Sequence, residues 1–129
     1  MPVIANAQAE EIPWRPGYRN FVLAGRTQGL DCIAGYSVIE PGAGAPLHAH
    51  ANVDEVFILL EGTLDFRLGD ERRLVEANHT IAIPAGVPHS FTAVGERPVR
   101  MFTFMPKTGA IAEATTYFEG GPPPGAGQH

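Results

Sequence analysis

The stretch Gly42–Gly62, GAGAPLHAHANVDEVFILLEG, decides the fold that we expect for this chain. A loop rich in Gly leads into His48 and His50, and Glu55 follows at the start of an apolar run. On a strand, residues two positions apart point to the same face, so both imidazoles can face one metal ion. Glu55 lies within reach of the same point and adds a carboxylate oxygen.

Around this stretch, short apolar runs alternate with turn residues along most of the chain. Leu64, Phe66 and Leu68 alternate with polar residues, which is the pattern of a strand with one wet face. Strands spaced by about 8 to 12 residues are typical of an all-β sandwich or barrel, which is the fold class that we predict. We expect strands over residues 32–39, 54–60, 64–68, 73–76, 80–83, 89–94 and 99–105.

The length of the chain suits a single domain. Its 129 residues include 15 Gly and 12 Pro, which favour many turns over long helices. We predict a flexible N-terminal arm over residues 1–11, a folded β-barrel over residues 12–118 and a disordered tail over residues 119–129. The tail is rich in Gly and Pro and has too few apolar side chains to bury a core.

Charge and apolar runs exclude several classes of partner. The chain has 9 Lys and Arg against 14 Asp and Glu, and it has no basic run, so nucleic-acid binding is disfavoured. The longest apolar run, Val56–Leu60, is far too short to span a membrane, and the first ten residues do not look like a secretory signal. Cys32 is the only cysteine, which excludes an internal disulfide and fits a reducing cytoplasm. We therefore predict a cytoplasmic protein that binds neither nucleic acid nor membrane.

His89 supplies a third imidazole from a distant part of the sequence. It comes directly after a turn rich in Pro and Gly and can return to the face that carries His48 and His50. Three neutral imidazoles and one carboxylate suit Fe, Mn, Co, Ni, Cu or Zn, and they leave one or two positions open for water, oxygen or substrate. We predict one divalent transition metal ion per chain, held by His48, His50, Glu55 and His89.

These residues resemble the two sequence motifs of the cupin family. The second motif departs at its ends, where Asn78 stands in place of the usual Gly and Ala93 in place of the usual Asn. The resemblance covers about residues 26–118 and implies a small single-domain cupin, a jelly-roll β-barrel with a metal ion inside. Residues 14–17 and 117–119 are further similar to the quercetin-dioxygenase-like subgroup. The matching positions are Gly42, His48, His50, Glu55 and Gly62 in the first motif and Pro84, Gly86 and His89 in the second.

Strand alternation also predicts a substrate pocket beside the metal. Phe57 and Phe91 each share a strand face with a predicted metal ligand, so both should point into the barrel. On the last strand, we expect Phe102 and Phe104 to point inward, because Arg100 would then lie at the rim. Such walls suit a small, largely apolar or aromatic substrate, and no cluster of Lys or Arg is present to clamp a phosphate.

Three functions stay open for such a site. The first, which we favour, is a metal-dependent dioxygenase: an enolic or phenolic substrate binds the metal as its anion, and Glu55 is the catalytic general base. The second is a non-redox lyase, isomerase or cyclase, in which the metal polarises a carbonyl group. The third is a small-molecule-binding module without turnover, because one fold hosts many roles. Oxygen consumption separates the first from the second.

The oligomeric state is a further expectation. Small cupins commonly pair, and a homodimer with two-fold symmetry is the default for a soluble oligomer. The segment Ile12–Trp14 is either a strand exchanged between subunits or a cover for the edge of its own barrel.

Overall fold

Strands account for most of the regular structure in the computed structural model, which describes residues 1–107 and 109–127. Two short 3-10 helices, Asn6–Gln8 and Arg26–Gln28, are the helices of this part of the chain, and neither has the length or apolar character to cross a membrane. The strands are β1 (Glu10–Arg15), β2 (Tyr18–Ala24), β3 (Ile33–Ile39), β4 (Gly44–His50), β5 (Glu55–Glu61), β6 (Thr63–Leu68), β7 (Glu71–Glu76), β8 (Thr80–Ile83), β9 (His89–Val94), β10 (Val99–Met105) and β11 (Thr115–Tyr117).

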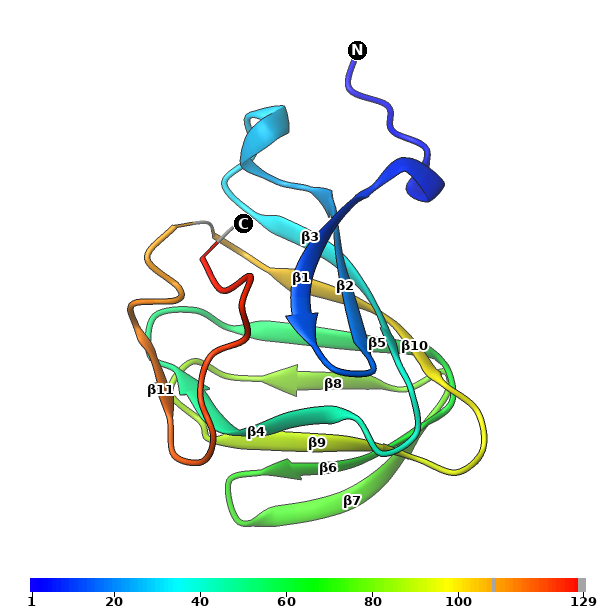
Figure 1. Ribbon diagram of the computed structural model, residues 1–129. Coiled ribbons are helices and arrows are strands. Elements are labelled where there is room, and N and C mark those ends of the chain that lie inside the picture. The colour runs from blue at the N-terminus through cyan, green and yellow to red at the C-terminus, as the bar shows by residue number, and fades with distance from the viewer. Residues whose placement is uncertain (108, 128–129) are drawn as a thin grey trace.

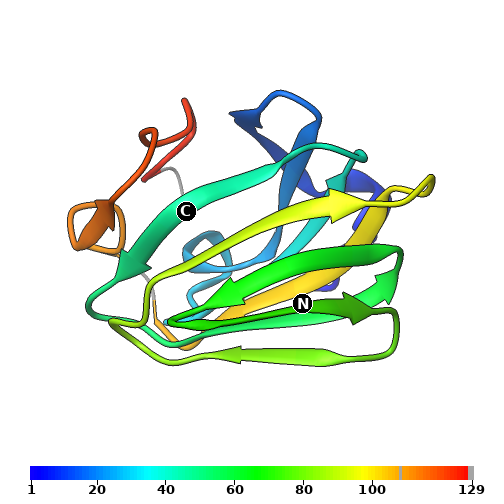
Figure 2. The ribbon, with the colours of Figure 1, turned by 90° about the horizontal axis from the view of Figure 1, so that it is seen from below.

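The strands form two antiparallel sheets that face each other. The first sheet has the order β1-β2-β3-β10-β5-β8, and the second has the order β11-β4-β9-β6-β7. In Figures 1 and 2 the second sheet lies across the first, and the two enclose the interior of a barrel. The prediction of an all-β jelly-roll barrel is therefore confirmed.

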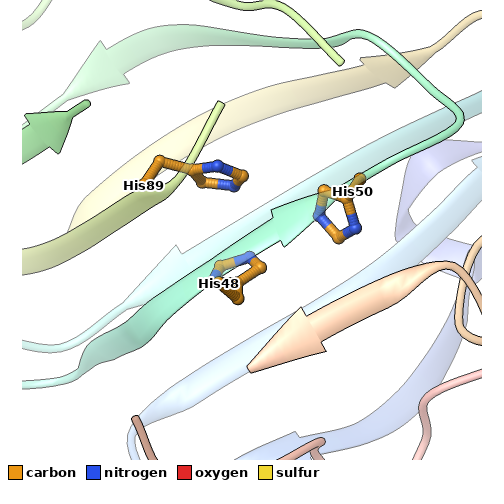
Figure 3. A group of neighbouring side chains, drawn as sticks. All are labelled: His48, His50 and His89. Carbon is orange, nitrogen blue, oxygen red and sulfur yellow. The ribbon is translucent and has the colours of Figure 1, made fainter. Parts of the chain in front are cut away.

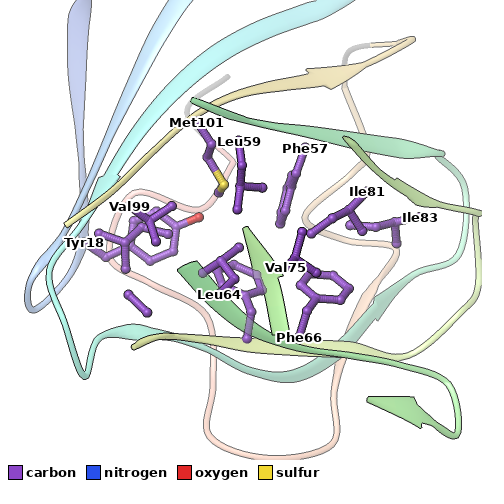
Figure 4. Packing of buried hydrophobic residues seen from close by; sticks show 13 residues of the cluster. Tyr18, Phe57, Leu59, Leu64, Phe66, Val75, Ile81, Ile83, Val99 and Met101 are labelled. Carbon is purple, nitrogen blue, oxygen red and sulfur yellow. The ribbon is translucent and has the colours of Figure 1, made fainter. Parts of the chain in front are cut away.

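The inner faces of the two sheets make the hydrophobic core, shown in Figure 4. Leu59 on β5, Leu64 on β6 and Met101 on β10 are fully buried and come from both sheets. Because successive side chains of a strand point to opposite faces, each of these strands alternates buried and more exposed positions. Removal of this apolar surface from water, at about 25 cal/mol per Å², is the main force that holds the sheets together.

On β10 the prediction for Phe102 and Phe104 is wrong, because the other set of side chains points inward. Met101 and Met105 are buried, whereas Phe104 is 40% exposed and Phe102 is half-buried. Arg100 lies on the same face of β10 as the two phenylalanines. Its guanidinium group contacts the hydroxyl group of Tyr36 and the carboxylate of Glu61 on the outer face of the sheet. Because residues two positions apart on a strand point to the same face, Phe102 and Phe104 lie on the outer face together with Arg100.

Apolar side chains gather on this outer face of the first sheet. The ring of Phe102 lies 5.7 Å from the ring of Tyr36 on the neighbouring strand, measured between centroids. Ile58, Leu60 and Phe104 are each about two-fifths exposed on the same sheet. This face is thus apolar without being part of the core.

The N-terminal strand begins two residues earlier than the boundary that we predicted. Glu10 and Glu11, which we assigned to the flexible arm, are part of β1 and pair with residues of β2. Ile12 pairs with Asn20 of the same chain. The segment therefore covers an edge of its own barrel in this structure.

Residues 119–127, which we predicted as a disordered tail, lie against the barrel in this structure (Figure 1). Arg15 on β1 donates a hydrogen bond to the carbonyl oxygen of Gly121 at 2.6 Å. A Cβ atom on Gly125 would collide with the backbone of β1, so only glycine permits this close approach. These contacts are made by the backbone of the tail, so the low apolar content of its side chains does not predict them. Residues 128–129 lie outside the described residues.

Candidate metal centre

Strands β4 and β9 bring three histidines together inside the barrel (Figure 3). His48 pairs with His89 across the two strands, and His50 follows two residues along β4. The distances between ring centroids are 4.2 Å for His48 and His89, 5.0 Å for His48 and His50, and 5.4 Å for His50 and His89. One ring nitrogen of each histidine lies within 4.8 Å of those of the other two. The structure thus brings together the three imidazoles that the sequence predicted as ligands.

The Nδ1 atoms of His48 and His89 are both engaged by backbone carbonyl groups. Nδ1 of His48 lies 2.6 Å from the Pro46 carbonyl oxygen, and Nδ1 of His89 lies 3.0 Å from the Val87 carbonyl oxygen. A carbonyl oxygen only accepts hydrogen bonds, so each Nδ1 carries a proton and donates it. The neutral ring then presents its lone pair at Nε2, as a metal ligand must.

The hydroxyl group of Thr115 on β11 fixes the same tautomer in His50. Thr115 Oγ1 donates its own proton to the Ile111 carbonyl oxygen at 2.6 Å. It therefore accepts a hydrogen bond from Nδ1 of His50, which lies 2.7 Å away, and leaves Nε2 with the lone pair. Sequence analysis missed Thr115, because β11 has three residues and is too short to show a strand period.

Glu55, the first residue of β5, lies beside two of the three histidines. Its Oε1 atom is 3.6 Å from Nε2 of His50 and 3.6 Å from Nε2 of His89, which is too far for a hydrogen bond. Burial raises the pKa of this carboxyl, but without a metal ion the His50 and His89 rings, in the form that carries a proton on Nε2, outweigh burial and lower the pKa to about 2. Glu55 is therefore ionised at neutral pH. Its role as a fourth ligand stays a prediction, because the mutually close set of donor atoms consists of the histidines among the described residues.

The donor set fits a divalent transition metal ion. Nε2 of His89 is buried and has no hydrogen-bond partner among residues 1–107 and 109–127, an arrangement that is unfavourable unless something binds there. Burial, with repulsion from His89, lowers the pKa of His48 to about 4, so its ring is neutral at neutral pH. Imidazole nitrogens beside a carboxylate suit first-row divalent ions from Mn to Zn. His48, His50 and His89, with Glu55 beside them, are the residues that would hold such an ion.

A cavity of about 180 Å³ opens beside the histidines, between the two sheets. Phe57 on β5 and Phe91 on β9 line it, as the alternation of strand side chains predicts. Phe102 and Phe104, which we also assigned to the pocket, do not line it, because they lie on the outer face of β10.

Part of the cavity wall consists of residues that sequence analysis missed. Tyr18 and Asn20 on β2 and Ser37 on β3 line the side of the cavity formed by the first sheet. Residues 18–24 were not predicted as a strand, so the inward face that carries Tyr18 and Asn20 was not predicted either.

The comparison with protein families decides the identity of this barrel. A family model described as the cupin domain matches residues 35–105, a segment that begins in β3, ends with β10 and contains the whole histidine cluster. The chain belongs to the cupin family. In this cupin, the three histidines are those that match the family motifs, and the resemblance drawn from the sequence is confirmed. The strand that carries His48 and His50, β4, was not among the strands that we predicted.

Curated relatives match parts of this cupin. It is 38% identical over 64 residues to mannose-1-phosphate guanylyltransferase 2 from Escherichia coli O157:H7 and 38% identical over 56 residues to quercetin 2,3-dioxygenase from Bacillus subtilis (strain 168). These alignments cover 50% and 43% of this chain, respectively. They cover 13% and 17% of the two relatives, so the chain spans less than a fifth of the length of either.

Solved structures match most of this cupin. A sugar phosphate isomerase of the cupin superfamily from Silicibacter pomeroyi superposes with a TM-score of 0.72 and 22% identity, covering 83% of this chain and 76% of that chain. The polyketide cyclase RemF from Streptomyces resistomycificus superposes with a TM-score of 0.71 and 21% identity, covering 82% and 79%. At such identities the likeness shows the fold alone.

Proposed function

We propose that this cupin is a metal-dependent dioxygenase that acts on a small enolic or phenolic substrate. One observation carries the proposal: three imidazoles, each held through Nδ1, direct their Nε2 atoms toward one region inside the barrel, with the carboxylate of Glu55 beside them. That point adjoins a cavity with phenylalanine walls, which suits an aromatic ligand.

A match to quercetin 2,3-dioxygenase, 38% identical over 56 residues, agrees with dioxygenase chemistry. An equally identical match belongs to mannose-1-phosphate guanylyltransferase 2, and the solved structures that superpose on this chain include an isomerase and a cyclase. Non-redox isomerase, lyase or cyclase chemistry and simple binding of a small molecule are therefore the competing functions that an experiment must separate.

Each residue of the centre has a distinct part in this proposal. A bound divalent ion supplies Lewis acidity and, when it is redox-active, electrons for reaction with O₂. Donation from Nδ1 locks the orientation of the three imidazole rings. The Glu55 carboxylate accepts the proton of the substrate hydroxyl group, and Phe57 and Phe91 line the cavity beside it.

The decisive experiment combines metal content with oxygen uptake. The protein is purified without a metal-affinity step, its metals are determined by elemental analysis, and oxygen consumption is followed with enolic and phenolic compounds. We expect about one redox-active ion per chain and oxygen uptake with at least one compound. Full turnover of a substrate by Zn-loaded protein without oxygen uptake would instead establish the non-redox function. A ligand that stays unchanged over long incubation would establish a binding module.

Substitution Glu55→Gln tests the proposed proton acceptor. The amide keeps the size of the side chain but does not take up a proton, so we expect turnover to fall by about 100-fold or more, in line with the contribution of general bases, while metal content changes little. Glu61→Gln at the exposed end of the same strand is the matched control and should leave turnover unchanged. Unchanged turnover in the Glu55 variant would remove this role.

A homodimer in the cytoplasm completes the proposal. The exposed apolar side chains of Ile58, Leu60 and Phe104 on the first sheet offer a surface for pairing with a second copy. Sedimentation equilibrium at micromolar concentration tests the dimer, and a monomer throughout would reject it. The cytoplasmic location stays a prediction.

A further inference from the structure

A second polar cluster faces the cavity from the wall opposite the β4 and β9 histidines. Asn20 on β2 and Ser37 on β3 are directly paired in the first sheet, and both line the cavity. Ser37 is fully buried, and its hydroxyl donates a hydrogen bond to Oδ1 of Asn20 at 3.1 Å. The metal centre does not use either residue.

Tyr18 extends this cluster toward the centre of the barrel. Its ring packs 6.0 Å from the ring of Phe91 and 6.3 Å from that of Trp14, measured between centroids. The Ser37 hydroxyl group is one of the groups that act on the Tyr18 hydroxyl group. Burial, reinforced by the negative charge of Glu55, raises the pKa of Tyr18, so the hydroxyl keeps its proton.

The hydrogen bond from Ser37 determines which atoms of Asn20 are available. The side-chain oxygen of Asn20 is occupied as an acceptor, so the two N–H groups of its amide are left to donate. None of the hydrogen bonds within residues 1–107 and 109–127 uses this amide nitrogen as a donor. Asn20 is only half-buried and lines the cavity, so a ligand can reach it.

The cavity is large enough for an aromatic ligand to lie between the two walls. A cavity of roughly 150 Å³ is known to accommodate benzene, and the cavity here measures about 180 Å³. The Asn20 amide is neutral, so it favours a neutral acceptor atom over an anion.

We propose that Asn20 is a specificity-determining residue, and that the substrate carries a carbonyl oxygen at the end away from its metal-binding hydroxyl groups. The carbonyl oxygen accepts a hydrogen bond from the Asn20 amide, while Ser37 holds that amide in the donating orientation. This inference rests on the proposed function, because it takes the histidine centre as the point where the hydroxyl groups bind.

Two matched catechols test this inference on Zn-loaded protein, in which no redox turnover occurs. 3′,4′-Dihydroxyacetophenone carries the distal carbonyl group, and 4-ethylcatechol has a similar shape without it. The dissociation constants of both are measured by titration calorimetry for the wild type and for Asn20→Leu. The ratio of the two constants is compared between proteins, because this comparison cancels the difference in acidity between the two catechols.

We expect the preference for the ketone to fall by about two- to tenfold in Asn20→Leu, which corresponds to the loss of one neutral hydrogen bond. Asn20→Asp keeps the acceptor for Ser37 but loses the donor, so it should lose the same preference, and it serves if the leucine variant does not fold. Tyr36→Phe removes a hydroxyl group on the opposite face of β3 and should leave the ratio unchanged.

The outcomes separate the two proposals. If both catechols bind and the ratio is the same in the wild type and both Asn20 variants, the role of Asn20 is overturned and the proposed function stands. If the wild type binds zinc but neither catechol, the phenolic substrate of the proposed function is overturned as well.

Discussion

On both sides of the barrel interior, alternate side chains of each strand point inward. On one side these side chains form a packed core, and on the other side they line a cavity. On the closed side, Leu59, Leu64 and Met101 are fully buried and fill the space between the sheets. On the open side, the inward positions of β3 carry Gly35 and Ser37 at its middle, and the cavity lies against them. The strand period decides which residues face inward, and side-chain volume decides whether they make a core or a site.

Gly35 packs closely against the neighbouring strand β10 on the open side of the barrel. A Cβ atom at this position would collide with Oγ1 of Thr103 on the neighbouring strand, so even alanine does not fit without a shift. Thr103 itself lines the cavity. Small residues on β3 therefore allow a polar side chain of β10 to reach the cavity wall, which the bulkier residues of the closed side would prevent.

The largest effect that separates the two sides is expected from Leu64→Ala. Leu64 is fully buried on the closed side, so truncation should lower the free energy of unfolding by about 2 to 5 kcal/mol, measured by urea denaturation. Leu74→Ala on the neighbouring strand β7 is the matched control, since Leu74 is 60% exposed and its loss should change stability by less than about 1 kcal/mol. Equal losses in the two variants would contradict the assignment of stability to the closed side.

The free energy of unfolding of the metal-free protein should depend on pH through two side chains on the open side of the barrel, His48 and Glu55. The folded state lowers the pKa of His48 from 6.5 to about 4 and that of Glu55 from 4.5 to about 2, so in both cases the unfolded chain binds more protons. The free energy of unfolding should therefore fall on acidification, between pH 6.5 and 4 for His48 and between pH 4.5 and 2 for Glu55. The loss is roughly 1 to 3 kcal/mol for each group.

Denaturation of the metal-free protein at a series of pH values measures this profile. His48→Asn should flatten its upper part, and Glu55→Gln should flatten its lower part. A profile that rises on acidification in the wild type would show that the two side chains are not held in the folded state as described.

The smallest effect is expected from loss of the hydroxyl group that orients His50, one of the candidate metal ligands. Thr115→Val removes the acceptor for Nδ1 of His50, so we expect the affinity for Zn²⁺ to fall by about 10- to 100-fold with little change in stability. Competition with a chromogenic chelator measures the affinity. Thr116→Val at the exposed neighbouring position of β11 is the control and should bind zinc like the wild type. Identical affinities in all three proteins would show that Thr115 does not orient His50.

Several features could be predicted because they depend on short segments of sequence. The spacing of His48, His50 and Glu55 and the turn before His89 belong to local patterns that a strand period and a family motif both constrain. The face of β10 could not be predicted in this way. Both of its faces carry large apolar side chains, and the partners that draw Arg100 outward come from other strands.

The tail and the second polar cluster were missed for a related reason. Gly121 and Gly125 are held by β1 from the far end of the chain, and apolar content is a poor guide to contacts made by the backbone. The Asn20 amide becomes a donor only because Ser37 on another strand takes its oxygen. Neither the contact between the tail and β1 nor the hydrogen bond between Ser37 and Asn20 can be recognised from the neighbouring residues in the sequence.

The sequence by itself determined the all-β class, the cupin family and the histidines of the candidate metal centre, because alternation and motif spacing are properties of consecutive residues. Only the tertiary structure decided which tautomer each histidine adopts, which side of the barrel stays open and what lines the wall opposite the β4 and β9 histidines. These depend on register and packing between strands that are distant in the chain, and such contacts form only when the two sheets close on each other.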